Sequence, residues 1–374
     1  MTRAFAHDGL SISAEAAEDD LIWLDEFLSP AFHAGSIDSA EAHVEFSASA
    51  SPIFDLPSGD PPPTDTADSI SAFALDSGPL ILPSLPLEHG QRLFDREAPI
   101  VFDVTNDRLH VHVRHRDCRL DARARLMRVL REYAHNHSVH AGGLMLHAAA
   151  IARGGRGVAL AGAKGAGKST MAMRLLERAG TDFVANDRLL VRMSADDTIA
   201  TGVPTIISFA ERTRSLFPEL ASRLARLGDF REHAAERRPG VHHGMFDGPR
   251  WYLSAAQLCD VLGQRQVGTV PLAAILILAP PDDMSTQPIR RLPQEEAATA
   301  LRENLLCRRS GRFISDVFVT ERARGAAPDL EARCRALASQ VPCYSVATSG
   351  DAIAMVDDHV QDLIDAIAAG YVAS

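Results

Sequence analysis

The strongest chemical signal in the sequence is a glycine-rich stretch at residues 162–169, GAKGAGKS. It fits the phosphate-loop pattern G-x-x-x-x-G-K-S/T in full. Glycines permit backbone angles that turn successive N–H groups inward around an anion. In such a loop Lys168 supplies positive charge to the β- and γ-phosphates, and the hydroxyl of Ser169 can bind Mg²⁺. The pattern therefore predicts that the chain binds a nucleoside triphosphate.

A phosphate loop needs a strand before it and a helix after it, because the helix N-terminus must point at the phosphates. The apolar runs 144–152 and 158–161 flank a turn and predict a β-hairpin that leads into the loop. After the loop, residues 169–179 predict a helix that ends at Gly180. The predicted nucleotide-binding residues are Gly162, Ala163, Lys164, Gly165, Ala166, Gly167, Lys168, Ser169 and Thr170.

The usual acidic partner of a phosphate loop follows an apolar strand and holds Mg²⁺. The apolar strand predicted at 270–278 is followed by Ala-Pro-Pro and offers no such acid. A shorter predicted strand, 183–185, is followed directly by Asn186 and Asp187. Asp187 is therefore the candidate metal ligand, together with Ser169.

These features together resemble HPr kinase/phosphorylase and its wider family of HPr-kinase-like proteins. The resemblance is carried by the LHA run at 146–148, by the glycine-rich loop and by the VANDR run at 184–188, where the family typically has ADDR. It is close from residue 144 to 193 and looser to about residue 310. It implies an α/β fold with a P-loop kinase core of the HPr kinase and phosphoenolpyruvate carboxykinase type.

The resemblance implies transfer of phosphate from ATP, with Mg²⁺, to a serine hydroxyl. It implies that Lys168 binds phosphate and that Ser169 binds Mg²⁺. It also implies that Asp187 lies near the acceptor hydroxyl as general base or metal partner, with His147 beside it. The predicted catalytic residues are therefore Asp187, His147 and Lys168.

The sequence departs from the family pattern at three points. Asn186 replaces one of the usual paired aspartates, and Thr170 stands where the bifunctional enzymes usually carry Glu. The C-terminal glycine- and arginine-rich signature associated with phosphorolysis is not recognisable. The departures predict a kinase only, with an acceptor other than HPr. The motif set is similar to that of the lasso-peptide tailoring kinases, which phosphorylate the C-terminal serine of a precursor.

The leading interpretation is an ATP-dependent serine kinase that acts on a peptide or protein, with a ribosomal natural-product precursor as one acceptor class. A small-molecule hydroxyl kinase on the same core remains open. So does a nucleotide-sensing regulatory protein whose chemistry has decayed. Asn186 favours the sensor slightly. The joint retention of four residues opposes it: Lys168, Ser169, Asp187 and His147.

The length of 374 residues suits two domains. We expect an N-terminal α+β region at 1–139, which could recognise the acceptor, and a catalytic domain at 140–374. The Pro-rich stretch at about 51–69 predicts a linker or long surface loop. An amphipathic helix is predicted within 14–32, and a further helix at 209–227.

Other chemistry-bearing residues have simpler interpretations. His110 and His112 share one face of a predicted strand, where they are either solvated or metal ligands. The predicted helix 121–137 carries arginines that are either solvated or face an acidic partner. Further candidates are the cations Arg250, Arg308, Arg309 and Arg312 and the pair His242 and His243.

Composition limits the partners. A formal net charge of -11 argues against general nucleic-acid binding, since nucleic-acid backbones are held by Lys and Arg. The N-terminus has no apolar signal region, and no stretch reaches the ~18 apolar residues that a membrane span needs. We therefore expect a cytoplasmic protein without a membrane partner, and a homo-oligomer is compatible with the family resemblance.

Overall fold

The computed structural model describes residues 1–48, 69–75, 78–95, 100–105, 110–115, 119–210, 216–226, 250–279, 288–306, 317–318, 329–348 and 353–370. The chain forms two compact units. The first contains residues 1–141 with the short described pieces 250–251 and 317–318, and the second contains the remaining described residues. Nearly all of the Pro-rich stretch lies outside the described residues, as do His242, His243, Arg308, Arg309 and Arg312.

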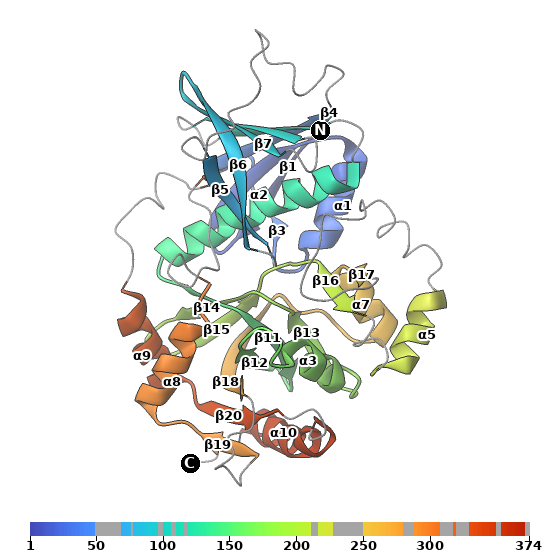
Figure 1. The fold of residues 1–374 in the computed structure, drawn as a ribbon, viewed down its shortest axis with the longest axis vertical. Coiled ribbons are helices and arrows are strands. Elements are labelled where there is room, and N and C mark those ends of the chain that lie inside the picture. The colour runs from blue at the N-terminus through green and yellow to red at the C-terminus, as the bar shows by residue number, and fades with distance from the viewer. Residues whose placement is uncertain are drawn as a thin grey trace. The chain divides into compact units, whose positions relative to one another are not determined.

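The first unit is built on a mixed nine-stranded sheet in the order β3-β1-β2-β4-β9-β8-β7-β6-β5 (Figure 1). The β2–β4 and β4–β9 pairs are parallel, and the other pairs are antiparallel. The strands are β1 (Thr2–His7), β2 (Leu10–Glu15), β3 (His33–Ala34), β4 (Ala42–Ala48), β5 (Ser69–Leu75), β6 (Gly78–Leu87), β7 (Gly90–Asp95), β8 (Ile100–Thr105) and β9 (His110–His115). The helices are α1 (Glu18–Leu28) and α2 (Arg119–His140).

The core of this unit lies between the sheet and α2, which packs against β2, β4 and β9. Because side chains alternate along a strand, Val111 and Val113 of β9 are buried while His110 and His112 lie on the opposite face. There both histidines approach the carboxylate of Glu45 on β4, at 3.5 and 3.6 Å. Among the described residues, no three His, Cys, Asp or Glu side chains form a group that could hold a metal ion.

In this unit the expectation for the arginine face of α2 needs correction, and the helix predicted within 14–32 is confirmed. The arginine face of α2 is not simply solvated, because Arg125 is buried and its Nε donates to Oδ2 of Asp95 at 2.6 Å. Arg131 is buried as well. The predicted helix within 14–32 is α1, and it starts only at Glu18 because the residues of β2 pair with β1.

The second unit has a mixed sheet in the order β10-β14-β15-β18-β12-β11-β13, with β20 on β18 and β19 on β20 (Figure 1). Its strands are β10 (Leu144–Leu146), β11 (Ala148–Arg153), β12 (Arg156–Gly162), β13 (Thr181–Ala185), β14 (Leu189–Met193), β15 (Thr198–Gly202), β18 (Thr269–Ala279), β19 (Ile289–Arg291) and β20 (Cys343–Ala347). Two further strands are β16 (Ile207–Ala210) and β17 (Arg250–Leu253). The helices are α3 (Lys168–Leu176), α5 (Pro218–Arg226), α7 (Ala255–Leu262), α8 (Gln294–Glu303), α9 (Leu330–Gln340) and α10 (Ile353–Ala368).

Parallel pairing at the centre of this sheet sets the place of the glycine-rich loop. β18 runs parallel to both β12 and β20, so their carboxyl ends meet at one edge, and the loop follows β12 there. Ala274, Ile275 and Leu276 of β18 have no exposed surface, as expected of a strand covered on both faces. α3 packs against β11, β12 and β13, and α10 packs against α3.

The two mixed sheets with packed helices confirm the predicted α/β class. The assignment to a P-loop kinase type stays a prediction. The helix predicted at 209–227 is wrong at residues 209–210, which belong to β16, and at 216–217, because α5 begins at Pro218, where proline suits the first helical turn. Residues 211–215 of this prediction lie outside the described residues. α3 also ends earlier than predicted, at Leu176. None of the described helices is long and apolar enough to cross a membrane.

Gly202 at the end of β15 offers a test of the close packing in the second unit. A Cβ on this residue would overlap the carbonyl oxygen of Val184 on β13, and backbone atoms cannot move aside cheaply. We expect Gly202→Ala to lower the free energy of unfolding by about 1–3 kcal/mol in a urea titration. The control Thr201→Ala, one residue earlier on the same strand, should change it by less than about 0.5 kcal/mol. Equal stability of the two variants would contradict this packing.

Candidate functional site

The glycine loop, residues 162–169, contains backbone angles that residues with side chains rarely adopt. Gly162, Gly165 and Gly167 have φ of 148°, 87° and 92°, in the region that favours glycine. A Cβ on Gly162 would also lie 2.5 Å from the carbonyl oxygen of Leu278 on the neighbouring strand β18. A Cβ on Gly165 or Gly167 would meet nothing within 4 Å, so open space lies beside the loop.

The helix that follows the loop begins at Lys168, with Gly167 as its N-cap. Gly167 has no side chain that could cap this helix end, and the first-turn N–H groups of the helix adjoin the loop. The Lys168 side chain is buried, and its Nζ donates to the carbonyl oxygens of Gly162 at 2.8 Å and Ala163 at 3.1 Å. Ser169 and Thr170 are half-buried in the first turn. This end of the helix therefore combines a lysine with a positive helix terminus.

A histidine and an aspartate form the second part of the site. His147 lies in the break between β10 and β11, and Asp187 lies in the turn between β13 and β14. Because β10 pairs with β14 and β11 pairs with β13, both breaks come together, and His147 Nε2 lies 3.0 Å from Asp187 Oδ1. The His147 side chain is 12% exposed and that of Asp187 is 44% exposed, so the carboxylate is the more accessible member.

Positive charge surrounds Asp187. Burial alone would raise the pKa of its carboxyl group, but the hydrogen bond with His147 and the charge of that ring act the other way. The charges of Arg188 and Lys168 add to this effect, and together they hold the pKa of Asp187 well below its usual range. The influence of Lys168 on this pKa connects the glycine loop with the His147–Asp187 pair.

Sequence reasoning missed one residue of the site, Asn304. Its side-chain Oδ1 accepts a hydrogen bond at 2.8 Å from the backbone N–H of Gly162, although 142 positions separate the two residues. Asn304 follows the last residue of α8 as its C-cap. Asparagine is a common residue at helix ends, so the sequence carries a capping signal but no sign of the contact with the loop.

The part of the chain that contains the glycine loop is similar to one protein family. The model of the family "SynChlorMet cassette protein ScmC" matches residues 119–223. The match includes the glycine loop, His147 and Asp187, and it spans less than a third of the chain. No curated protein sequence matches the chain.

Among solved structures, the chain is similar to the HPr(Ser) kinase/phosphatase from Coxiella burnetii, with 13% sequence identity and a TM-score of 0.28. That similarity covers 58% of this chain and 94% of the other.

The donor set at the site suits a hard cation better than a soft one. Ser169 and Asp187 offer oxygen ligands, and such ligands are preferred by Mg²⁺. Mg²⁺ in phosphoryl-transfer sites commonly takes one or two protein oxygens and completes its shell with phosphates and water. Ser169 and Asp187 therefore carry donor atoms of the kind that Mg²⁺ prefers.

The charge balance around Asp187 predicts how stability depends on pH. A carboxyl group whose pKa is lowered in the folded state stabilises the fold above its unfolded pKa of about 4 and loses that effect as the pH falls further. We expect Asp187→Asn to be less stable than the wild type at pH 5, by at most about 1 kcal/mol because the side chain is partly exposed. Urea unfolding from pH 5 to pH 2 should show the difference shrinking below pH 4. A difference that does not change with pH would contradict the lowered pKa.

Proposed function

We propose that the chain is an ATP-dependent kinase that transfers the γ-phosphate to a serine hydroxyl of a peptide or protein. The observation that carries the proposal is that one unit of the chain holds both the glycine loop with its positive φ values and the carboxylate of Asp187 in contact with His147 at 3.0 Å. A phosphate-binding loop and a partly exposed carboxylate close to it are the two parts that such a transfer needs.

The glycine loop would bind the triphosphate. Positive φ values such as those of its glycines allow backbone N–H groups to turn toward an anion, and the start of α3, with glycine as its N-cap, adds the partial positive charge of a helix N-terminus. Lys168 Nζ donates to the carbonyl oxygens of Gly162 and Ala163, and charged phosphate oxygens are stronger acceptors than carbonyl oxygens. Binding would therefore turn this ammonium group from the loop carbonyls to the phosphates.

Asp187 would act on the acceptor. In the proposed step the serine oxygen forms a bond to the γ-phosphorus, the bond from that phosphorus to the β–γ bridging oxygen breaks, and ADP leaves. The proton of the serine hydroxyl passes to the Asp187 carboxylate, which His147 orients through the 3.0 Å contact. Positioning and charge on the phosphoryl oxygens account for most of the rate in this class of reaction.

The lowered pKa of Asp187 is compatible with a site in which the substrate supplies further negative charge. A carboxylate with a strongly lowered pKa is a weak base. Lys168 and Arg188 contribute to that lowering, and a bound triphosphate would offset their charge. Nucleotide binding would therefore raise the pKa of Asp187 and make it a better proton acceptor. Ser169 would bind Mg²⁺ together with the phosphates, and Asp187 would be a metal partner in the alternative in which it is not the general base. The ion would supply positive charge next to the phosphoryl oxygens.

A peptide acceptor, such as a ribosomal natural-product precursor, is the substrate class that we favour. The support is the resemblance of the LHA run, the loop and the VANDR run to the HPr-kinase-like proteins. The residue range of the match to a cassette-protein family includes the same three runs. We place acceptor recognition in the N-terminal region, at residues 1–139. A cytoplasmic location and a possible homo-oligomer remain part of the proposal.

Intact-mass spectrometry of serine-containing acceptor peptides after incubation with Mg-ATP tests the proposed function. We expect the wild type to add one phosphate to a serine. Lys168→Ala should lose this activity together with much of its affinity for ATP. Asp187→Asn should bind ATP but lower the rate by at least about 100-fold, because the proton acceptor is absent.

Two results would separate the alternatives. Phosphorylation of a small hydroxyl compound but of no peptide would identify a small-molecule kinase. Tight ATP binding without transfer to any acceptor would indicate a nucleotide sensor, and both results would contradict the proposal of a peptide kinase.

A further inference from the structure

We propose that Asn304 is a positioning residue that fixes the position of the glycine loop relative to His147. The inference rests on the proposed function for its meaning, but its direct readout is nucleotide affinity rather than phosphoryl transfer. Asn304 is 5% exposed, and all of the contacts that carry the argument lie within the second unit.

The side chain of Asn304 joins the loop to α8. Its Oδ1 accepts from the N–H of Gly162 at 2.8 Å, and its Nδ2 donates to the carbonyl oxygen of Ala300 at 2.8 Å. An amide can serve both partners at once because it has an acceptor atom and a donor atom on one rigid group. Gly162 is the residue at which β12 ends and the loop begins, so this bond fixes the start of the loop.

The main chain around Asn304 holds the other half of the site. Its carbonyl oxygen accepts from the N–H of His147 at 2.8 Å. The next residues continue the contact, since Leu305 bridges to Leu146 and the N–H of Leu306 donates to the carbonyl oxygen of Met145 at 2.8 Å. One residue therefore fixes both the first residue of the glycine loop and the histidine that contacts Asp187.

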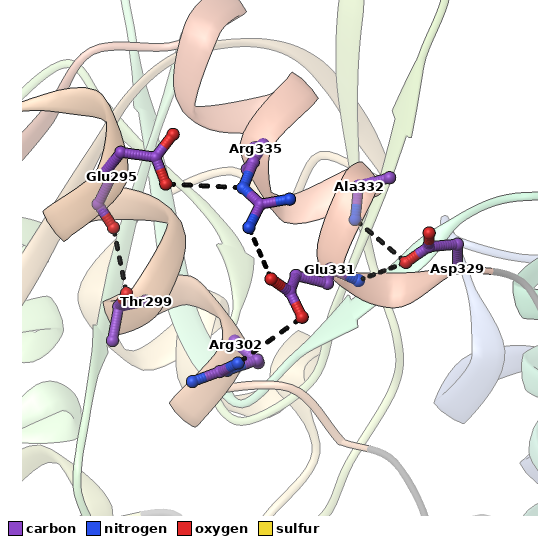
Figure 2. Close-up of polar contacts among 7 residues, drawn as sticks. All are labelled: Glu295, Thr299, Arg302, Asp329, Glu331, Ala332 and Arg335. Atoms are coloured by element: carbon purple, nitrogen blue, oxygen red, sulfur yellow. Dashed lines mark hydrogen bonds and ion pairs between the residues drawn. The ribbon is translucent and has the colours of Figure 1, made fainter.

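α8, which ends at Asn304, is itself tied to α9 by an ion-pair network (Figure 2). Arg335 of α9 donates to Glu295 at 3.4 Å and to Glu331 at 2.5 Å, and Glu331 in turn lies 3.7 Å from Arg302. These side chains are about half-exposed or more, so each ion pair contributes little to the free energy of folding. The network acts mainly by holding α8 against α9. The end of α8 is therefore supported from outside the loop that it contacts.

Substitution of Asn304 separates this role from a general contribution to folding. Asn304→Ala leaves the buried N–H of Gly162 without its acceptor, and we expect the dissociation constant for Mg-ATP to rise about tenfold. Asn304→Asp keeps an acceptor for Gly162 but brings an oxygen against the carbonyl of Ala300 and adds negative charge beside the loop. Its affinity should fall at least as far, because the added charge also repels phosphate.

Isothermal titration with Mg²⁺ and a non-hydrolysable ATP analogue gives the affinity, and steady-state kinetics with an acceptor peptide separates kcat from KM. Both kcat and the affinity should fall in the Asn304 variants, since His147 shifts together with the loop. The matched control is Asn136→Ala, in which a buried asparagine of the first unit loses its bond to the carbonyl oxygen of Phe318. The control should lose stability but keep the wild-type affinity.

The outcomes distinguish this inference from the proposed function. If the wild type binds the analogue but phosphorylates no acceptor, the proposed function fails, and the loss of affinity in the Asn304 variants still supports the positioning role. If the Asn304 variants bind the analogue as the wild type does, the positioning role is overturned whatever the phosphorylation result. If Asn304→Ala does not fold, Asn304→Leu decides, because leucine has a similar branched shape, carries no charge and makes neither hydrogen bond. Lack of binding by the wild type would overturn both proposals.

Discussion

The glycine loop depends on the way in which β12 ends. Gly162 has a φ of 148°, and a Cβ at this position would lie 2.5 Å from the carbonyl oxygen of Leu278. Only a residue without a side chain lets the chain leave the sheet here while β12 stays paired with β18. The same residue then receives the side chain of Asn304 at its N–H and the ammonium group of Lys168 at its carbonyl oxygen. The loop, α3 and the end of α8 therefore all make contact at the backbone of Gly162.

Two cationic side chains act on the carboxylate of Asp187. The charges of Lys168 and Arg188 lower the pKa of Asp187, and its Oδ1 lies 3.0 Å from His147 Nε2. In the proposed function, a bound triphosphate would offset the charges of these two side chains. This charge effect comes from different observations than the glycine pattern on which the nucleotide prediction rests. It bears less on the acceptor, since a serine hydroxyl carries no charge.

The features that could be predicted from the sequence are local ones. The spacing of glycine and lysine within residues 162–169 predicts a loop between a strand and a helix, and the structure has β12 before it and α3 after it. The contact of Gly162 with Asn304 could not be predicted, because it joins positions 142 residues apart through the packing of α8. The burial of Arg125 was missed for a similar reason, since its partner Asp95 lies on another element. The start of α5 at Pro218 had a local signal that the apolar and arginine pattern of residues 209–227 obscured.

A crystal structure of the chain with Mg²⁺ and a non-hydrolysable ATP analogue tests the central claim most directly. The account predicts that the β-phosphate lies inside the glycine loop and that Lys168 Nζ has moved from the carbonyl oxygens of Gly162 and Ala163 to the phosphates. It also predicts that the γ-phosphate faces Asp187, with space for a hydroxyl group between them. An analogue bound away from the loop, or a γ-phosphate directed away from the His147–Asp187 pair, would contradict the account.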